Sequence, residues 1–169
     1  MSRLLRTAII VLLLAALVVP ASAAGRLPAA EKLTLKNGIT LYYLKNADLP
    51  LVSFRMWIPG AGLAGEPDAL EGAANLNAAL LQKGTATMTA EAVAEAVDFL
   101  GAGFDISAGD EFAGLTAESL TEHFPRLMAI AADCLMHPAF KPEEFEKERK
   151  TRLDGLKAVM DNPGAAVRS

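Results

Sequence analysis

The chain is poor in the side chains that form cross-links or bind metals: its 169 residues include one cysteine and two histidines. A single cysteine excludes an intrachain disulfide, so stability must come from a packed core. Cys134 sits in an apolar segment, and we expect it to be buried and inert. The two histidines, His123 and His137, both come late in the chain.

Positive charge is also scarce. The sequence carries 16 Lys and Arg against 20 Asp and Glu, a formal net charge of −4. Removal of the first 23 residues, which contain Arg3 and Arg6 and no acid, would take this charge to −6. Phosphate backbones are bound by clustered Lys and Arg, so we expect no nucleic-acid partner. The basic residues between 141 and 152 alternate with glutamates and indicate a solvated helix face.

Long apolar runs are missing beyond the N-terminus. The apolar run at residues 7–19 is shorter than the roughly 20 residues that a bilayer core requires. A basic start, MSRLLR, precedes this run, and Pro20 with Ala21-Ser22-Ala23 follows it, which is the layout of a secretory signal peptide. We therefore predict a signal peptide at residues 1–23, a linker at 24–30 and export to a periplasm. The alternative is an uncleaved anchor, which would leave the protein membrane-associated.

The rest of the sequence contains strand-like and helix-like segments. Asn37-Gly38 joins two β-rich runs and predicts a hairpin. Alternating apolar residues predict strands, and apolar residues at helical spacing predict helices. The expected strands are 33–35, 39–44, 51–58, 104–107 and 112–118, and the expected helices are 68–83, 89–100, 121–136 and 142–160.

This order, βββααββαα, predicts an α+β fold over residues 31–169, with a mostly antiparallel sheet and helices packed on it. Asp68 and Glu71 have the spacing of a capping box at the first helix, and Gly84 is a typical residue to follow its C-terminus. Thr89 is expected to cap the second helix, and Thr121 to open the third. Because no closing element follows the last turn, we expect this domain to be incomplete at its C-terminus.

Three segments carry a resemblance in the right order. LTLKNGITLYYLKNADLPLVSFRMWIPGAG forms the opening hairpin and third strand, and a helix ending in LLQKGT comes next. LGAGFDISAGDEFAGL and HPAFKPEEFEKERKTRLDGLKAVMDNP follow as a strand pair and a long helix. Together they resemble the N-terminal part of a domain of the pitrilysin/insulinase-type zinc metallopeptidases (inverzincins). The resemblance spans roughly residues 31–167.

The resemblance implies where a zinc site would stand. In that family, H-x-x-E-H puts two histidines on one helical face, where both reach one zinc. The glutamate takes a proton from the zinc-bound water, and a glutamate on the later long helix completes the ligand set. Matched on the closing Gly-Thr, the two histidines fall on Asn75 and Ala79 and the glutamate on Ala78. Matched on the Glu-Arg pair at 148–149, the distant glutamate falls on Gly155.

These four positions predict a chain with no zinc and no catalytic residue. Alanine and glycine have no side-chain donor, and an amide is a poor zinc ligand. A structural zinc gains about 10–16 kcal/mol from its full ligand set, of which almost nothing would remain here. The two histidines are too far downstream for a change of register to restore the motif. Asn75 and Asn77 remain as candidates for contacts with a peptide or a partner.

Two further groups of side chains have simpler interpretations. Cys134-x-x-His137, with His123 nearby, mimics a metal-ligand pair, and we interpret it as a packed cysteine and two helix-end histidines. The acids Asp105, Asp110 and Glu111 could form a carboxylate cluster, and we interpret them as solvated turn residues.

Glycine-rich turns and a tryptophan complete the survey. Gly60-Ala61-Gly62 and Gly101-Ala102-Gly103 look like phosphate loops, but the second follows a helix instead of opening one, and we interpret both as loop glycines. Trp57, on the third strand, is expected in the core or at an interface.

The favoured hypothesis is a catalytically inactive peptidase-like subunit. The family resemblance implies pairing with an active homologous zinc metallopeptidase, and the inactive chain would bind extended peptides, at a sheet edge for example. One alternative is a zinc metalloendopeptidase whose active site lies in a missing C-terminal part. Another is a structural subunit of a membrane-associated complex.

Overall fold

The computed structural model describes residues 29–46 and 48–161. The predicted signal peptide, most of the predicted linker and the residues after 161 lie outside these ranges. The chain divides into two compact units, with the boundary between Asp48 and Leu49. None of the helices in the described ranges is long and apolar enough to cross a bilayer.

The first unit contains a β-hairpin. Strand β1 (Glu31–Thr34) pairs antiparallel with β2 (Thr40–Tyr43). The turn between them is closed by a hydrogen bond from the Leu35 amide to the Ile39 carbonyl, 2.8 Å long. Gly38 takes a φ of 87°, which glycine adopts without strain. The hairpin that Asn37-Gly38 predicted is confirmed.

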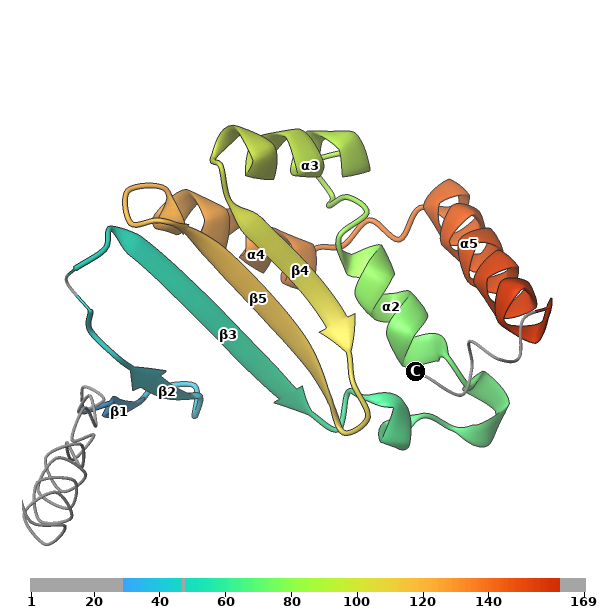
Figure 1. Ribbon diagram of the computed structural model, residues 1–169, viewed down its shortest axis with the longest axis horizontal. Helices are drawn as coiled ribbons and strands as arrows, with labels where there is room; N and C mark the ends of the chain where they lie inside the picture. Colours follow the sequence, from blue (N-terminus) through green and yellow to red (C-terminus); the bar gives the residue numbers. More distant parts are fainter. Residues whose placement is uncertain (1–28, 47, 162–169) are drawn as a thin grey trace, which may run out of the picture. The chain divides into compact units, whose positions relative to one another are not determined.

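The second unit is built on a three-stranded antiparallel sheet. Its strands are β3 (Leu51–Pro59), β4 (Gly103–Ala108) and β5 (Phe112–Leu120), in the order β3-β5-β4. Figure 1 shows β5 at the centre of this sheet and β4 on the side of helix α2. We expected one sheet, whereas the described strands form two separate antiparallel sheets.

Four helices and two short 3-10 turns complete the described part of the second unit, up to residue 161. The helices are α2 (Ala73–Leu81), α3 (Ala90–Phe99), α4 (Phe124–Met136) and α5 (Pro142–Asp161), and the turns are η1 (Leu63–Gly65) and η2 (Asp68–Leu70). The order βββααββαα is confirmed, and so is the α+β class with its antiparallel pairing.

The core lies between the sheet and α2, α3 and α4. Alternate residues of β4 and β5 point into it, among them Ile106 and Leu115, and Leu127 of α4 meets them from the other side. Cys134 is 0% exposed in this cluster, which confirms its predicted burial. Burial raises the pKa of the Cys134 thiol to about 11. The thiolate is therefore disfavoured at neutral pH.

Two predicted helix starts are wrong. Helix α2 begins at Ala73, and the segment at Asp68 is a 3-10 turn without the expected capping box. The Glu66 carboxylate instead accepts hydrogen bonds from the amides of Gly72 and Ala74. A carboxylate from the preceding loop thus satisfies amides at the start of α2, a long-range cap that the local spacing did not indicate. Helix α4 begins at Phe124, a turn later than Thr121.

Candidate functional site

Helix α2 is the element on which any site would be built, because it carries the positions matched to a zinc motif. It lies between the outer side of β4 and helix α5 and contacts both (Figure 1). Its position therefore places one helical face near a sheet edge and near the long helix. This geometry brings residues more than seventy positions apart into contact, as the bond between Arg152 and Asn75 shows.

The C-terminal end of α2 is tied to the segment between α4 and α5. The Ala139 amide donates to the Gly84 carbonyl at 3.1 Å, and the Ala86 amide donates to the His137 carbonyl at 2.9 Å. Thr85 is 3% exposed and forms an isolated β-bridge with Pro138. The Gly-Thr close that we used to align the helix is therefore a structural junction.

One face of α2 carries Asn75, Ala78, Ala79 and Gln82, and we call it the 75–82 face. Residues three, four and seven apart fall on the same side of an α-helix, so these four side chains share one surface. Ala78 is 3% exposed and belongs to the core, while Asn75 and Ala79 are partly exposed. The three α2 positions that the resemblance singled out thus occupy one surface.

Asn77 does not share this surface. It lies two residues from Asn75, a rotation of about 200° around the helix axis, and it is exposed. The two asparagines therefore do not face one groove, and they would have to contact different ligands or partners.

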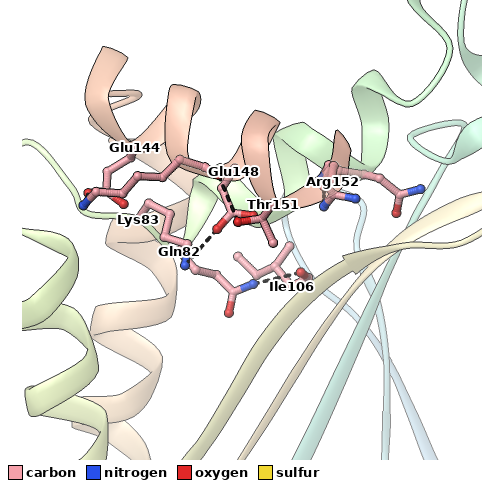
Figure 2. A network of polar contacts seen from close by, with 9 residues as sticks. Gln82, Lys83, Ile106, Glu144, Glu148, Thr151 and Arg152 are labelled. Carbon is pink, nitrogen blue, oxygen red and sulfur yellow. Dashed lines mark hydrogen bonds and ion pairs between the residues drawn. The ribbon is translucent and has the colours of Figure 1, made fainter. Parts of the chain in front are cut away.

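Helix α5 reaches the 75–82 face with an arginine. The Arg152 guanidinium donates to the Asn75 backbone carbonyl over 2.7 Å, and its Nε is buried without a hydrogen-bond partner. Glu148, one turn earlier, pairs with Lys83 at 3.1 Å. Figure 2 shows Arg152, Glu148 and Lys83 together along the join between the two helices. Gly155 follows Arg152 by three positions and so lies near the same side of α5.

The residues present do not fit a zinc ion. The four matched positions offer one neutral amide, two methyl groups and a glycine whose added Cβ would meet nothing within 4 Å. A positively charged guanidinium lies against the same helix, and it would repel a divalent cation. In the ranges that the structure describes, no group of three or more His, Cys, Asp or Glu is placed to hold a metal.

Gln82 links the 75–82 face to β4. Its Nε2 donates to the Ile106 carbonyl at 2.9 Å (Figure 2). The hairpin closes with the Gly109 amide donating to the Phe112 carbonyl, and bonded and non-bonded pairs alternate along an antiparallel ladder. Phe104, Ile106 and Ala108 therefore turn their backbone N–H and C=O groups away from β5. Gln82 thus satisfies the carbonyl group of the middle residue, Ile106.

The other candidate ligands, the two histidines, Cys134 and the turn acids, form no metal-binding group within the described ranges. The His137 ring hydrogen bonds to Asp133 at 3.0 Å, next to the buried Cys134. His123 stands at the start of α4, beside Glu122. The three predicted turn acids are exposed, namely Asp105, Asp110 and Glu111.

The glycine turns and Trp57 are placed as follows. An added Cβ on Gly62 would lie 2.5 Å from the Gly109 carbonyl oxygen, so glycine is needed for the loop to approach the β4–β5 turn. Gly101, with a φ of 56°, follows the end of α3. Trp57 is 60% exposed on the side of the sheet away from the core, so its predicted core placement is wrong and the interface role stays a prediction.

Sequence reasoning missed three residues of this region, Gln82, Glu148 and Arg152. Helical spacing could have found the first, because Gln82 is seven positions after Asn75 and so falls on the same face. Arg152 could not be assigned from spacing, because its role depends on how α5 packs against α2. The family pattern drew attention to Gly155 instead.

Comparison with known proteins identifies the family of this chain. The sequence profile of the insulinase family, peptidase family M16, matches residues 42–169. A zinc protease of Rickettsia bellii is 32% identical over 133 residues, which are 79% of this chain and 32% of that protein. The zinc protease YmxG of Bacillus subtilis is 26% identical over 137 residues, 81% of this chain and 33% of that protein. The chain thus spans about one third of the length of these relatives.

Solved structures show the same fold. A peptidase M16 inactive domain from Pseudomonas fluorescens superposes with a TM-score of 0.75 at 24% identity, covering 80% of this chain and 33% of that one. A protease from Helicobacter pylori superposes with a TM-score of 0.70 at 20% identity, covering 80% and 32%. With the family profile matched over most of its length, the chain belongs to the insulinase family, peptidase family M16.

Proposed function

We propose that this chain is part of a catalytically silent M16 subunit that binds extended peptide and works with an active homologous zinc protease. The observation that carries the proposal is the 75–82 face, where an amide and two methyl groups stand at the positions of the family's histidines and glutamate. A hydrolytic zinc lowers the pKa of its bound water, and protein donor atoms must hold it in place to do so. This face offers no imidazole or carboxylate donor.

The peptide-binding part of the proposal is supported by the outer edge of β4. Strand β4 has a strand neighbour on one side only within the described sheet. Its outward N–H and C=O groups can pair with the backbone of an added strand, which is how sheet edges take up extended peptides. Backbone pairing needs no catalytic residue, so this activity can persist after the ligands are lost.

Two other features support the proposed protease partner and the proposed periplasmic location. A silent subunit acts on substrate only through a partner, and a homologous zinc protease is the partner that the family membership favours. The signal-like residues 1–23 favour a periplasmic location for the pair.

A metal and peptidase assay tests the proposal. Purified protein, incubated with zinc and dialysed, is analysed for bound metal and for cleavage of an unstructured peptide. The assay is repeated after mixing with an active M16 protease from the same source. We expect no stoichiometric zinc and no cleavage by the chain alone, and an altered cleavage rate or site preference in the mixture.

A matched variant provides the positive control. Combining Asn75→His, Ala79→His and Gly155→Glu restores the three metal-ligating residues, and nothing lies within 4 Å of an added Cβ at position 155. Ala78 is left unchanged because a glutamate there would enter the core. We expect more zinc on this variant than on the natural chain, with no peptidase activity. Stoichiometric zinc on the natural chain would refute the proposal.

The length of the relatives favours one alternative. Since the chain spans about a third of proteins described as zinc proteases, a longer form could carry its ligand set elsewhere. An H-x-x-E-H sequence in the complete gene product would decide for this alternative.

A further inference from the structure

We propose that Gln82 closes the β4 edge as a side-chain substitute for a peptide, so that an extended ligand pairs with the whole edge only after displacing it. The inference rests on the proposed peptide-binding function and adds a regulating residue to the same site. Gln82 is suited to this role because its primary amide carries the same N–H and C=O groups as a peptide bond.

The contact geometry supports this competition. The Gln82 Nε2 lies 2.9 Å from the Ile106 carbonyl oxygen, the distance of a ladder hydrogen bond. An added strand would bring its own backbone N–H to this oxygen. Both donors approach from the side away from β5, so an added strand and the Gln82 amide compete for the same side of this oxygen.

Gln82 meets one of three outward-facing positions on β4. Phe104, Ile106 and Ala108 turn their backbone groups away from β5, and among the described residues a side-chain donor contacts only the Ile106 carbonyl. This contact closes the edge at its centre. Covering an edge also protects against unwanted strand pairing, which gives the arrangement a benefit in the absence of ligand.

Gln82 is held firmly in this position. It is the residue that ends α2, and its amide donates to the Ala79 carbonyl. The junction at Gly84 and Thr85 follows directly and fixes the chain beyond it. Release of the Ile106 carbonyl therefore requires a rotation of the Gln82 side chain.

Peptide titration on the full chain tests the inference. The probe is a fluorescein-labelled eight-residue peptide of alternating valine and threonine, followed by fluorescence anisotropy. Gln82→Leu removes the donor and keeps a side chain of similar size, and we expect it to bind the probe about 2- to 10-fold more tightly, because one net hydrogen bond no longer competes. Glu95→Gln, at an exposed position of α3, is the control and should bind like the natural chain.

A second variant and a second probe make the result specific. Gln82→Glu has no donor at neutral pH and should also bind more tightly, which covers the case in which Gln82→Leu folds poorly. The same peptide with alternate amides N-methylated should bind all variants weakly, since it lacks the donors for the edge. In hydrogen exchange, the Ile106 amide of the Gln82 variants should slow when the unmodified probe is added.

The outcomes separate the two proposals. Equal or weaker binding by both Gln82 variants, with clear binding by the natural chain, would overturn the role of Gln82 and leave peptide binding standing. Absence of binding by every variant, including those with an open edge, would overturn both.

Discussion

At the scale of single residues, replacing glycine by alanine should have opposite effects on stability at two positions of this chain. Gly84 has a φ of 107°, and an added Cβ would lie 2.9 Å from the Met88 carbonyl oxygen. Gly155 lies inside helix α5, where an added Cβ meets nothing within 4 Å. The same substitution therefore probes backbone strain at one site and helix propensity at the other.

We expect Gly84→Ala to lower the free energy of unfolding by about 2 kcal/mol or more, from the left-handed conformation and the contact with Met88. Gly155→Ala should raise it by about 0.5–1 kcal/mol, because alanine loses less backbone freedom on entering a helix. Urea unfolding of both variants, followed by circular dichroism, measures the two effects. A stabilised Gly84→Ala protein would contradict the junction described here.

Residue patterns predicted the local features of this fold and missed those that depend on packing. Asn37-Gly38 predicted its hairpin, and Thr89 caps α3 through a hydrogen bond from the Ala92 amide, because both signals act within a few residues. The start of α2 was missed because Glu66 caps it from an earlier loop. The empty ligand positions could be read from the sequence, whereas the guanidinium of Arg152 beside them could not.

At the scale of elements, the joint between α2 and α4 has a charged component. Asp133, in the last turn of α4, hydrogen bonds to His137 and to the Thr87 hydroxyl of the loop after α2. Hydrogen bonding from the Thr85 hydroxyl, followed by His137, holds the pKa of Asp133 below its ordinary value. The ionised form is thus preferred by the folded state over the unfolded one.

This preference fixes the sign of a pH effect. Since the folded-state pKa of Asp133 is depressed, its contribution is present above the unfolded pKa of about 3.9 and is lost as the pH falls through the folded pKa. We expect Asp133→Asn to be less stable than the natural chain at pH 7, with the difference shrinking below about pH 4. Urea unfolding at pH 7 and pH 3 measures it, with the exposed Glu95→Gln on α3 as control. A difference that stays constant with pH would assign Asp133 a role independent of its charge.

At the scale of the whole chain, the sequence predicted the class and element order but not which helix faces would be covered. The apolar residues of α5 lie near one side of the helix, yet Leu156 is 62% and Met160 79% exposed. Helical spacing shows that side chains share a face, but burial depends on what packs against it. The relatives are about two and a half times as long as this chain, so sequence beyond the matched third is available in them to cover such a face.

The single thiol gives this protein a built-in probe of its own opening. Cys134 has no accessible surface and no second cysteine with which to react, so a labelling reagent can reach it only when the surrounding cluster comes apart. We expect the natural chain to resist Ellman's reagent at neutral pH and to react fully in urea, and the labelling rate to report the population of opened molecules. Rapid labelling without denaturant would mean that this core opens transiently far more often than its packing indicates. When labelling is slow, the modified fraction of the purified chain reports its stability without engineered tags, because each molecule carries one sulfhydryl.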